Sequence, residues 1–289
     1  MLLLFLSIVC SSCLPLLFKA FQGWQVSIAW AVSLNYLACT LWGSLFSLGP
    51  AGPSFPLLQP WIPAALLQGL LLAGNFYLLA NTAQRAGVAI ASLSSRLSVA
   101  IPVLVAIPLY GESLDILKSI GIFAALLALY LGTAPSKGSV QTIRLQTLGL
   151  PVIVFFSFGL HFTLLKYAQH VFLSQNQHHQ YLMVSFFFAL LFSLAVLIRI
   201  QGPIRSLLSG KTWLGGLFLG SCNYFSLFLM TRVLSYEDWP SSVVFPTHSV
   251  GVVILSTVAA VFIFSENLSL KRTFGLIIGS FAVVALNIG

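Results

Sequence analysis

The chain consists of long apolar stretches separated by short polar or Gly/Pro-containing segments. A helix needs about 20 apolar residues to cross a bilayer, whereas the strands of a membrane barrel are shorter and alternate in polarity. Because the hydrocarbon core offers no water to backbone groups, unbroken stretches of this length favour helices. The pattern predicts an all-α polytopic membrane protein with ten transmembrane helices, at 2–20, 26–48, 60–82, 88–110, 114–133, 146–168, 180–200, 211–234, 240–264 and 273–288.

The two halves of the chain repeat. Lys19 and Gln22 end the first helix and Lys166 and Gln169 end the sixth, since 166 − 19 and 169 − 22 both equal 147. The polar stretch 134–146 separates the halves.

Further matches follow in the same order. Asn-Phe-Tyr at 75–77 corresponds to Asn-Tyr-Phe at 223–225, and Gly-Glu-Ser-Leu at 111–114 corresponds to Ser-Glu-Asn-Leu at 265–268. With five helices in each half, the halves insert in opposite senses, which predicts an inverted repeat. The expected repeats cover 1–134 and 145–289.

Composition agrees with a membrane protein. Hydrophobic residues make up 58% of the 289 positions and charged residues 6%, whereas a soluble domain needs about a quarter of its residues charged. The net charge of +8 comes from single, scattered cations rather than a basic face. We therefore expect the lipid bilayer as a partner, and no nucleic acid. The N-terminal stretch 1–17 lacks a basic n-region and is expected to be a mature helix rather than a signal peptide.

Two stretches carry a family resemblance. The segment 89–132, which contains ASLSSRLSVAIPVLVAIPLYGESLDILKSIG, and the segment 242–279, which contains VVFPTHSVGVVILSTVAAVFIFSENLSLKRTFG, resemble the two halves of an EamA-type member of the drug/metabolite transporter superfamily. The resemblance covers essentially the whole chain. It implies ten helices in inverted repeats around a central substrate cavity lined by helices 1, 3, 4, 6, 8 and 9. It names no substrate, because the family carries diverse metabolites.

The orientation of the chain stays open. Cations in loops after odd-numbered helices outnumber those after even-numbered helices by nine to three, which favours both termini outside. The resemblance implies both termini inside. The expected location is a cell membrane, the inner membrane in a bacterium, with the chain as a multi-pass monomer or homodimer.

Arg96 is the strongest candidate for a binding residue. It lies within the fourth apolar stretch, where Ser92 shares its helix face four residues earlier and Ser95 lies beside them. A charge at this depth costs about 2.5–3.5 kcal/mol and needs a partner or a cavity. Its guanidinium suits a substrate carboxylate or phosphate. The alternative is an arginine that reaches the headgroups from near the helix end.

The remaining candidates are polar groups on other helices. His248 lies beside Pro246 in the ninth helix, and His161 lies in the sixth. Each suits substrate binding or proton transfer, or is a neutral histidine bonded to a carbonyl. A polar stripe on the third helix and its counterpart on the eighth line a cavity or form hydrogen bonds between helices. The stripe residues are Asn75, Tyr77, Asn81, Gln84, Asn223 and Tyr224.

The acidic residues all lie at helix ends or in loops: Glu112, Asp115, Glu237, Asp238 and Glu266. No carboxylate stands mid-membrane to hold a lipophilic cation, which disfavours a cationic-drug exporter. Glu112 and Glu266 are expected to begin the helices that follow them. Lys19 and Lys166 are interpreted as snorkelling, with a place at a cavity mouth as the alternative.

Other residues suggest less. Cys10 and Cys13 form a CxxC pair, but Cys39 and Cys222 stand alone in apolar stretches, so a thiol relay is not expected. The metal-ligand types His170, His178 and His179 are expected in a solvated loop. Gly275-x-x-x-Gly279 and the Ala124, Ala128, Gly132 series are faces for close helix approach.

These observations predict a secondary transporter. It would move a small polar, anionic or zwitterionic metabolite such as an amino acid by alternating access, with the fourth and ninth helices hinging near their prolines. A lipid or lipid-linked sugar flippase of the same fold is the alternative. An enzyme is not expected, since no nucleophile, base or metal ligands converge in sequence, and neither a cofactor nor a metal is expected.

Overall fold

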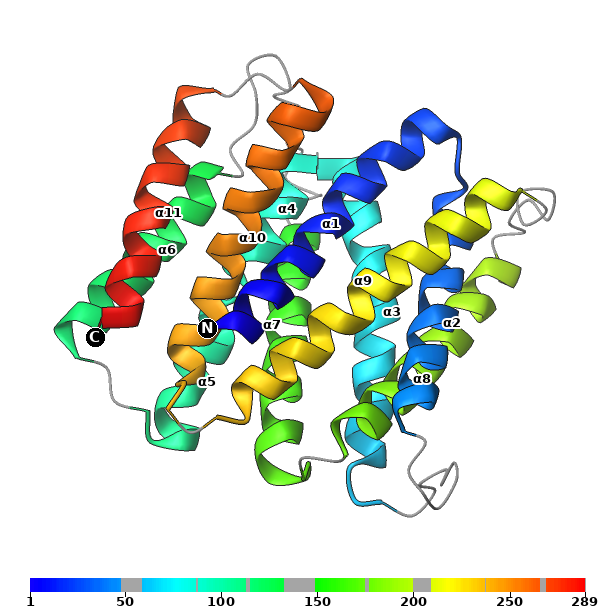
Figure 1. Cartoon of the computed structure of the whole chain (residues 1–289), viewed down its shortest axis with the longest axis horizontal. Coiled ribbons are helices and arrows are strands. Elements are labelled where there is room, and N and C mark those ends of the chain that lie inside the picture. Colours follow the sequence, from blue (N-terminus) through cyan, green and yellow to red (C-terminus); the bar gives the residue numbers. More distant parts are fainter. Residues whose placement is uncertain are drawn as a thin grey trace. The chain divides into compact units, whose positions relative to one another are not determined.

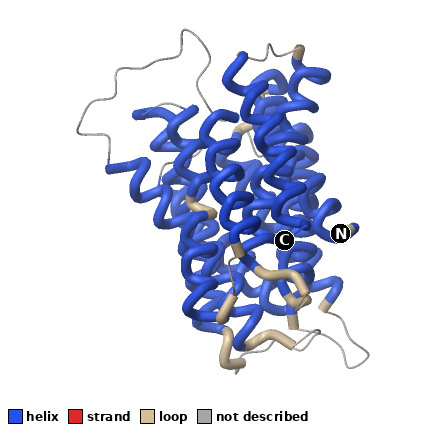
Figure 2. Tube along the Cα trace, turned by 90° about the vertical axis from the view of Figure 1, so that its left-hand side faces the viewer, coloured by secondary structure: helices blue, strands red, loops and turns tan. Residues whose placement is uncertain are grey.

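The computed structural model describes residues 1–47, 59–86, 88–112, 115–132, 149–174, 177–199, 209–236, 238–265 and 269–288. Within these residues the chain forms eleven helices and no strand (Figures 1 and 2). The helices are α1 (Leu2–Trp24), α2 (Ile28–Phe46), α3 (Ile62–Ala86), α4 (Val88–Leu97), α5 (Ala100–Tyr110), α6 (Ile116–Gly132), α7 (Gly149–Val171), α8 (His178–Arg199), α9 (Gly210–Leu234), α10 (Ser241–Phe264) and α11 (Leu270–Ile288).

The helices follow the predicted apolar stretches, with one difference. The fourth stretch is divided into α4 and α5 by two turn residues, Ser98 and Val99. Eight helical segments of the described chain are long and apolar enough to cross a membrane, counting the fourth stretch as one segment. The helix α6 is shorter, with 17 residues, and α11 is not among the eight. The chain is therefore a helical protein suited to multiple membrane crossings, while the count of ten remains a prediction.

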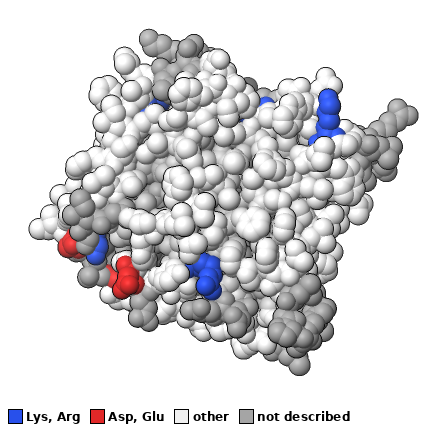
Figure 3. Space-filling model, in the orientation of Figure 1, with Lys and Arg blue, Asp and Glu red and all other residues white. Residues whose placement is uncertain are grey.

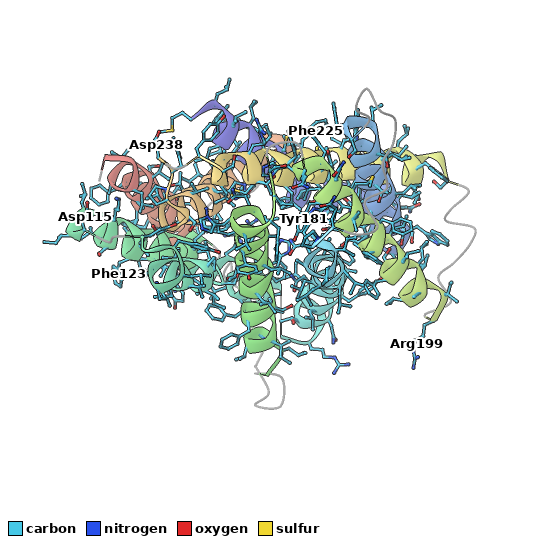
Figure 4. All side chains as sticks on the ribbon, turned by 90° about the horizontal axis from the view of Figure 1, so that it is seen from below. Asp115, Phe123, Tyr181, Arg199, Phe225 and Asp238 are labelled. Atoms are coloured by element: carbon cyan, nitrogen blue, oxygen red, sulfur yellow. The ribbon has the colours of Figure 1, made fainter. Side chains whose placement is uncertain are left out.

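The exposed surface is apolar. Large hydrophobic side chains such as Phe123 and Phe262 are 71% and 82% exposed, and Phe123 points outward from α6 (Figure 4). Soluble monomers rarely expose wide apolar areas. The face drawn in Figure 3 carries few charged side chains over a broad uncharged surface. Such a surface suits contact with lipid.

The chain divides into two compact units, each drawing segments from both predicted repeats. Unit 1 consists of 1–73 and 167–235, and unit 2 consists of 74–166 and 236–289.

In unit 1, α9 packs against α1 and α2, and α2 also packs against α8. The approach of α9 to α2 depends on small residues. A Cβ placed on Gly220 would lie 2.4 Å from the Asn35 carbonyl oxygen, and one on Gly216 would lie 2.9 Å from that of Ala31. This Gly-x-x-x-Gly pair lets the two backbones meet.

In unit 2, α6 lies along α11, and both contact α10 (Figure 1). Ala125 and Ala128 of α6 are buried, as are Ala282 and Ala285 of α11. A Cβ on Gly279 would lie 3.4 Å from the Ala128 Cβ. The prediction that small residues on these helices serve close approach is confirmed.

Candidate functional site

The division between α4 and α5 has a local cause. Pro102 has no N–H, so the carbonyl of Ser98 lacks its usual partner four residues on, and the ring crowds that carbonyl. The amide of Ile101 donates to the Ser98 carbonyl instead, at 3.0 Å. The serine hydroxyls add to the disruption, since Ser95 donates to the Ser92 carbonyl at 2.9 Å and Ser98 to the Ser95 carbonyl at 2.7 Å. The proline and the serines together end α4.

Arg96 lies in the last turn of α4, next to this break. Its side chain is half-buried, as are Ser92 and Ser95. Among the described residues, no carboxylate lies against the guanidinium. The partial negative charge at the C-terminal end of a helix favours a cation there. Arg96 is thus a half-buried cation in the last turn of a helix, and its guanidinium carries five N–H donors that suit an anion.

The first turns of α10 carry the densest group of buried polar side chains in unit 2. These are Ser241, Ser242, Thr247, His248 and Ser249. The hydroxyl of Thr247 is buried without a hydrogen-bond partner among the described residues. The helix runs unbroken through Pro246, unlike the divided α4 and α5. The two proline-containing segments therefore differ in this structure.

A carboxylate holds the N-terminus of α10. Oε1 of Glu112 accepts hydrogen bonds from the Ser241 amide at 2.8 Å and the Ser241 hydroxyl at 2.6 Å, and Oε2 accepts one from the Ser242 amide at 2.8 Å. Burial opposes ionisation of this carboxyl, but the bonds from Ser241 and Ser242 outweigh it, and the pKa of Glu112 lies below its ordinary value. The expectation that Glu112 begins the following helix is wrong.

The residue that begins the following helix is Asp115. Its Oδ1 accepts a hydrogen bond from the Lys118 amide at 2.7 Å in the first turn of α6. Sequence position alone does not separate Glu112 from Asp115, because both acids precede the same apolar stretch. Glu266, its expected counterpart, lies outside the described residues, as does Glu237.

Lys166 is buried beside the same region rather than snorkelling. It is 9% exposed, and its Nζ lies 5.3 Å from the ring centroid of Tyr110. This cation–π contact and the electrostatic attraction of the Glu112 carboxylate both favour an amine there. The snorkelling interpretation is therefore wrong for Lys166.

The third helix contributes Asn75 to unit 2. The Ser157 hydroxyl of α7 donates to Oδ1 of Asn75 at 2.5 Å, so the hydrogen bond between helices that the sequence allowed is present. Tyr77 and Asn81 are half-buried on the same helix. The side chain of Gln84 lies outside the described residues.

His161 lies one turn after Ser157 on α7. It is buried next to Phe162, whose ring packs on Phe245 of α10 with a centroid distance of 5.6 Å. Ile101 of α5 fits against Gly159. The helix α7 thus contacts both α5 and α10 within unit 2.

Asn223 and Tyr224 belong to unit 1 and have protein partners there. Asn223 donates to Oδ1 of Asn35 at 3.1 Å. The Tyr224 hydroxyl lies 2.6 Å from Nδ1 of His179, and its ring is fully buried. Eight of the ten predicted residues lie in unit 2, and these two lie in unit 1.

Two further expectations for unit 1 are wrong. His178 and His179 begin α8, and His178 is buried rather than in a solvated loop. Cys222 is not isolated in space, because Cys10 and Cys13 of α1 lie close enough to act on its thiol electrostatically. Among the described residues, the four cysteines are free thiols, and no three metal-ligating side chains converge.

Comparisons with known proteins bear on the fold of the chain and not on its chemical activity. No family model matches the sequence. An uncharacterized protein of Haemophilus influenzae is 29% identical over 295 residues, which cover 98% of this chain and 96% of that protein. A solved protein crystal structure aligns with a TM-score of 0.80 at 17% identity, over 99% of this chain and 96% of that one. This fold is therefore found in a solved structure over nearly the whole chain.

Proposed function

We propose that the chain is a secondary transporter of the drug/metabolite transporter superfamily, with ten helices in two inverted five-helix repeats. It would move a small polar metabolite, anionic or zwitterionic like an amino acid, across a cell membrane by alternating access. In a bacterium this would be the inner membrane. The helical, apolar chain and the EamA-like motifs support the proposal.

One observation carries the choice of substrate class. Arg96 is a half-buried cation next to a divided helix, with no described carboxylate against it. Carriers use divided helices to expose backbone and side-chain groups to a substrate near the middle of the membrane. A guanidinium offers paired donors to a carboxylate. The acidic residues are absent from the eight candidate spans, so no anion of the protein there competes with the substrate.

The test compares the wild type with Arg96→Ala and with Arg199→Ala, which removes an exposed arginine at the end of α8 (Figure 4). Melting temperatures are measured against amino acids, organic acids, phosphorylated metabolites and cationic dyes. We expect an anion or zwitterion to stabilise the wild type and Arg199→Ala. A hydrogen bond to a charged group is worth about 1.5–3 kcal/mol. Its loss should weaken the binding of this ligand to Arg96→Ala by roughly ten- to a hundredfold.

Uptake of the stabilising compound is then measured in proteoliposomes that contain each protein. Uptake by the wild type and by Arg199→Ala, with little by Arg96→Ala, is the expected result. Equal stabilisation of all three proteins, or stabilisation by cations alone, would contradict the assignment of Arg96.

A further inference from the structure

Two helix N-termini meet at one end of unit 1. Nε2 of Gln177, just before α8, lies 3.4 Å from Oε1 of Gln59, just before α3. The amide of Ile62 donates to the Gln59 carbonyl, and the amide of Tyr181 donates to the Gln177 carbonyl. Each N-terminus carries a partial positive charge. The structure therefore places two positive helix ends side by side.

Three buried polar groups at this junction have no hydrogen-bond partner among the described residues. They are Nε1 of Trp61, Nδ1 of His178 and the hydroxyl of Tyr181, and these residues are 1%, 1% and 0% exposed. An unsatisfied buried group costs about 1–3 kcal/mol, and most such groups in proteins are bonded. Here three such groups lie at the starts of α3 and α8.

Two of these residues are in contact, and the third lies on the same helix as one of them. The rings of Trp61 and Tyr181 meet edge to face, with centroids 5.9 Å apart, and His178 and Tyr181 lie one turn apart on α8. Tyr181 points inward from α8 (Figure 4). The polar neighbour Ser185 donates its own hydroxyl proton to the Tyr181 carbonyl at 2.8 Å.

The charges around the junction are positive. Arg232 of α9 acts electrostatically on the imidazoles of His178 and His179. The sequence of unit 1, residues 1–73 and 167–235, contains no aspartate or glutamate. An indole N–H only donates, a phenol can donate, and an imidazole protonated on Nδ1 donates as well. This set of groups suits an acceptor with negative charge and does not suit a cation.

We propose that Trp61, His178 and Tyr181 form a buried site for a small oxyanion, a carboxylate or a phosphate group. The indole and phenol donate to its oxygens, and the N-termini of α3 and α8 with Arg232 supply positive potential. The site uses none of the residues assigned to the transported substrate. A test of this site is therefore independent of the test of the proposed transport function.

The test follows the indole N–H resonances of the full chain in detergent. The chain has six tryptophans, and Trp61→Phe identifies the Trp61 signal by its disappearance. Sodium acetate and sodium phosphate are titrated in separate arms, at constant ionic strength set with sodium chloride. We expect one of the two oxyanions to shift the Trp61 signal saturably, and the arm that responds identifies a carboxylate or a phosphate ligand.

Variants separate binding from folding. Trp61→Phe and Tyr181→Phe keep the rings and remove one donor each, and each should weaken the anion's stabilisation of the protein about tenfold, the scale of one hydrogen bond to a charged group. Trp213→Phe and Tyr236→Phe, at exposed positions, should bind as the wild type does. A Trp61 signal that moves with neither oxyanion, or equally with chloride, would overturn the proposal even if every variant folds.

Discussion

At the residue scale, Glu112 shows how one side chain connects distant segments. It lies between α5 and α6, yet its carboxylate accepts hydrogen bonds from the first amides of α10, 129 and 130 positions away. A carboxylate at a helix N-terminus satisfies free amides and meets a favourable partial charge. The loop after α5 is thereby attached to the start of α10.

This contact makes stability depend on pH. Because the folded-state pKa of Glu112 lies below its ordinary value, the stabilisation is fully present above the unfolded pKa of about 4.3 and is lost as pH falls through the folded pKa. Glu112→Gln should lower the free energy of unfolding by about 1 kcal/mol at neutral pH, the scale of a lost N-cap. Half-exposure of the carboxylate keeps the effect modest.

The measurement is denaturant unfolding of both proteins across pH, with Asp115→Asn as a matched control at the start of α6. The difference between wild type and Glu112→Gln should shrink as pH falls below 4. A difference that is constant from neutral to acidic pH would show that the carboxylate charge plays no part.

At the element scale, the approach of α9 to α2 depends on the absence of a side chain at Gly220. Gly220→Ala would bring a methyl group against the Asn35 backbone, where overpacking costs about 1–3 kcal/mol. Gly74→Ala in α3 is the control, because nothing lies within 4 Å of its added Cβ. We expect Gly220→Ala to melt lower than the wild type and Gly74→Ala to melt at the same or a higher temperature. Equal melting of both variants would mean that α9 shifts freely on α2.

The break between α4 and α5 is the second feature at this scale. Pro102→Ala restores the N–H that the Ser98 carbonyl lacks, so we expect a more continuous helix and unchanged or higher thermal stability. If the break shapes the substrate site, the ligand found in the melting screen should bind more weakly to Pro102→Ala. Pro108→Ala, in the same segment beyond the break, should bind it normally. Loss of binding in both variants would assign the effect to the helix as a whole.

At the scale of the whole molecule, an even number of crossings places both termini on one side of the membrane. We expect the same reporter fused to either terminus to give the same result, active at both ends or inactive at both. A periplasmic phosphatase and a fluorescent cytoplasmic protein serve as complementary reporters. Opposite sidedness would contradict ten crossings and would assign α6 or α11 to a place outside the membrane. The shared side also decides between the orientations favoured by charge and by resemblance.

Much of the helix pattern followed from the sequence, because the length of an apolar stretch and the polar residues that end it are local properties. The helices α3 and α9 lie close to their predicted ranges for this reason. The prolines predicted a hinge in the fourth helix but not a break at Ser98, since proline is also tolerated within helices, as Pro246 is in α10.

The candidate site was only partly visible in the sequence. A charge within an apolar stretch marks Arg96 without any knowledge of its neighbours. The partners of Asn75 and Asn223 depend on which helices meet, and neither their spacing nor their chemistry indicates Ser157 or Asn35.

The sequence by itself determined the class of this protein: helical, apolar and suited to lipid, because free energies of transfer add along a local stretch. Only the tertiary structure decided that Glu112 accepts the first amides of α10, that Lys166 lies on Tyr110, that Trp61 meets Tyr181, and that His178 is buried. Burial and pairing depend on residues far apart in the chain, and these meet only when the helices pack.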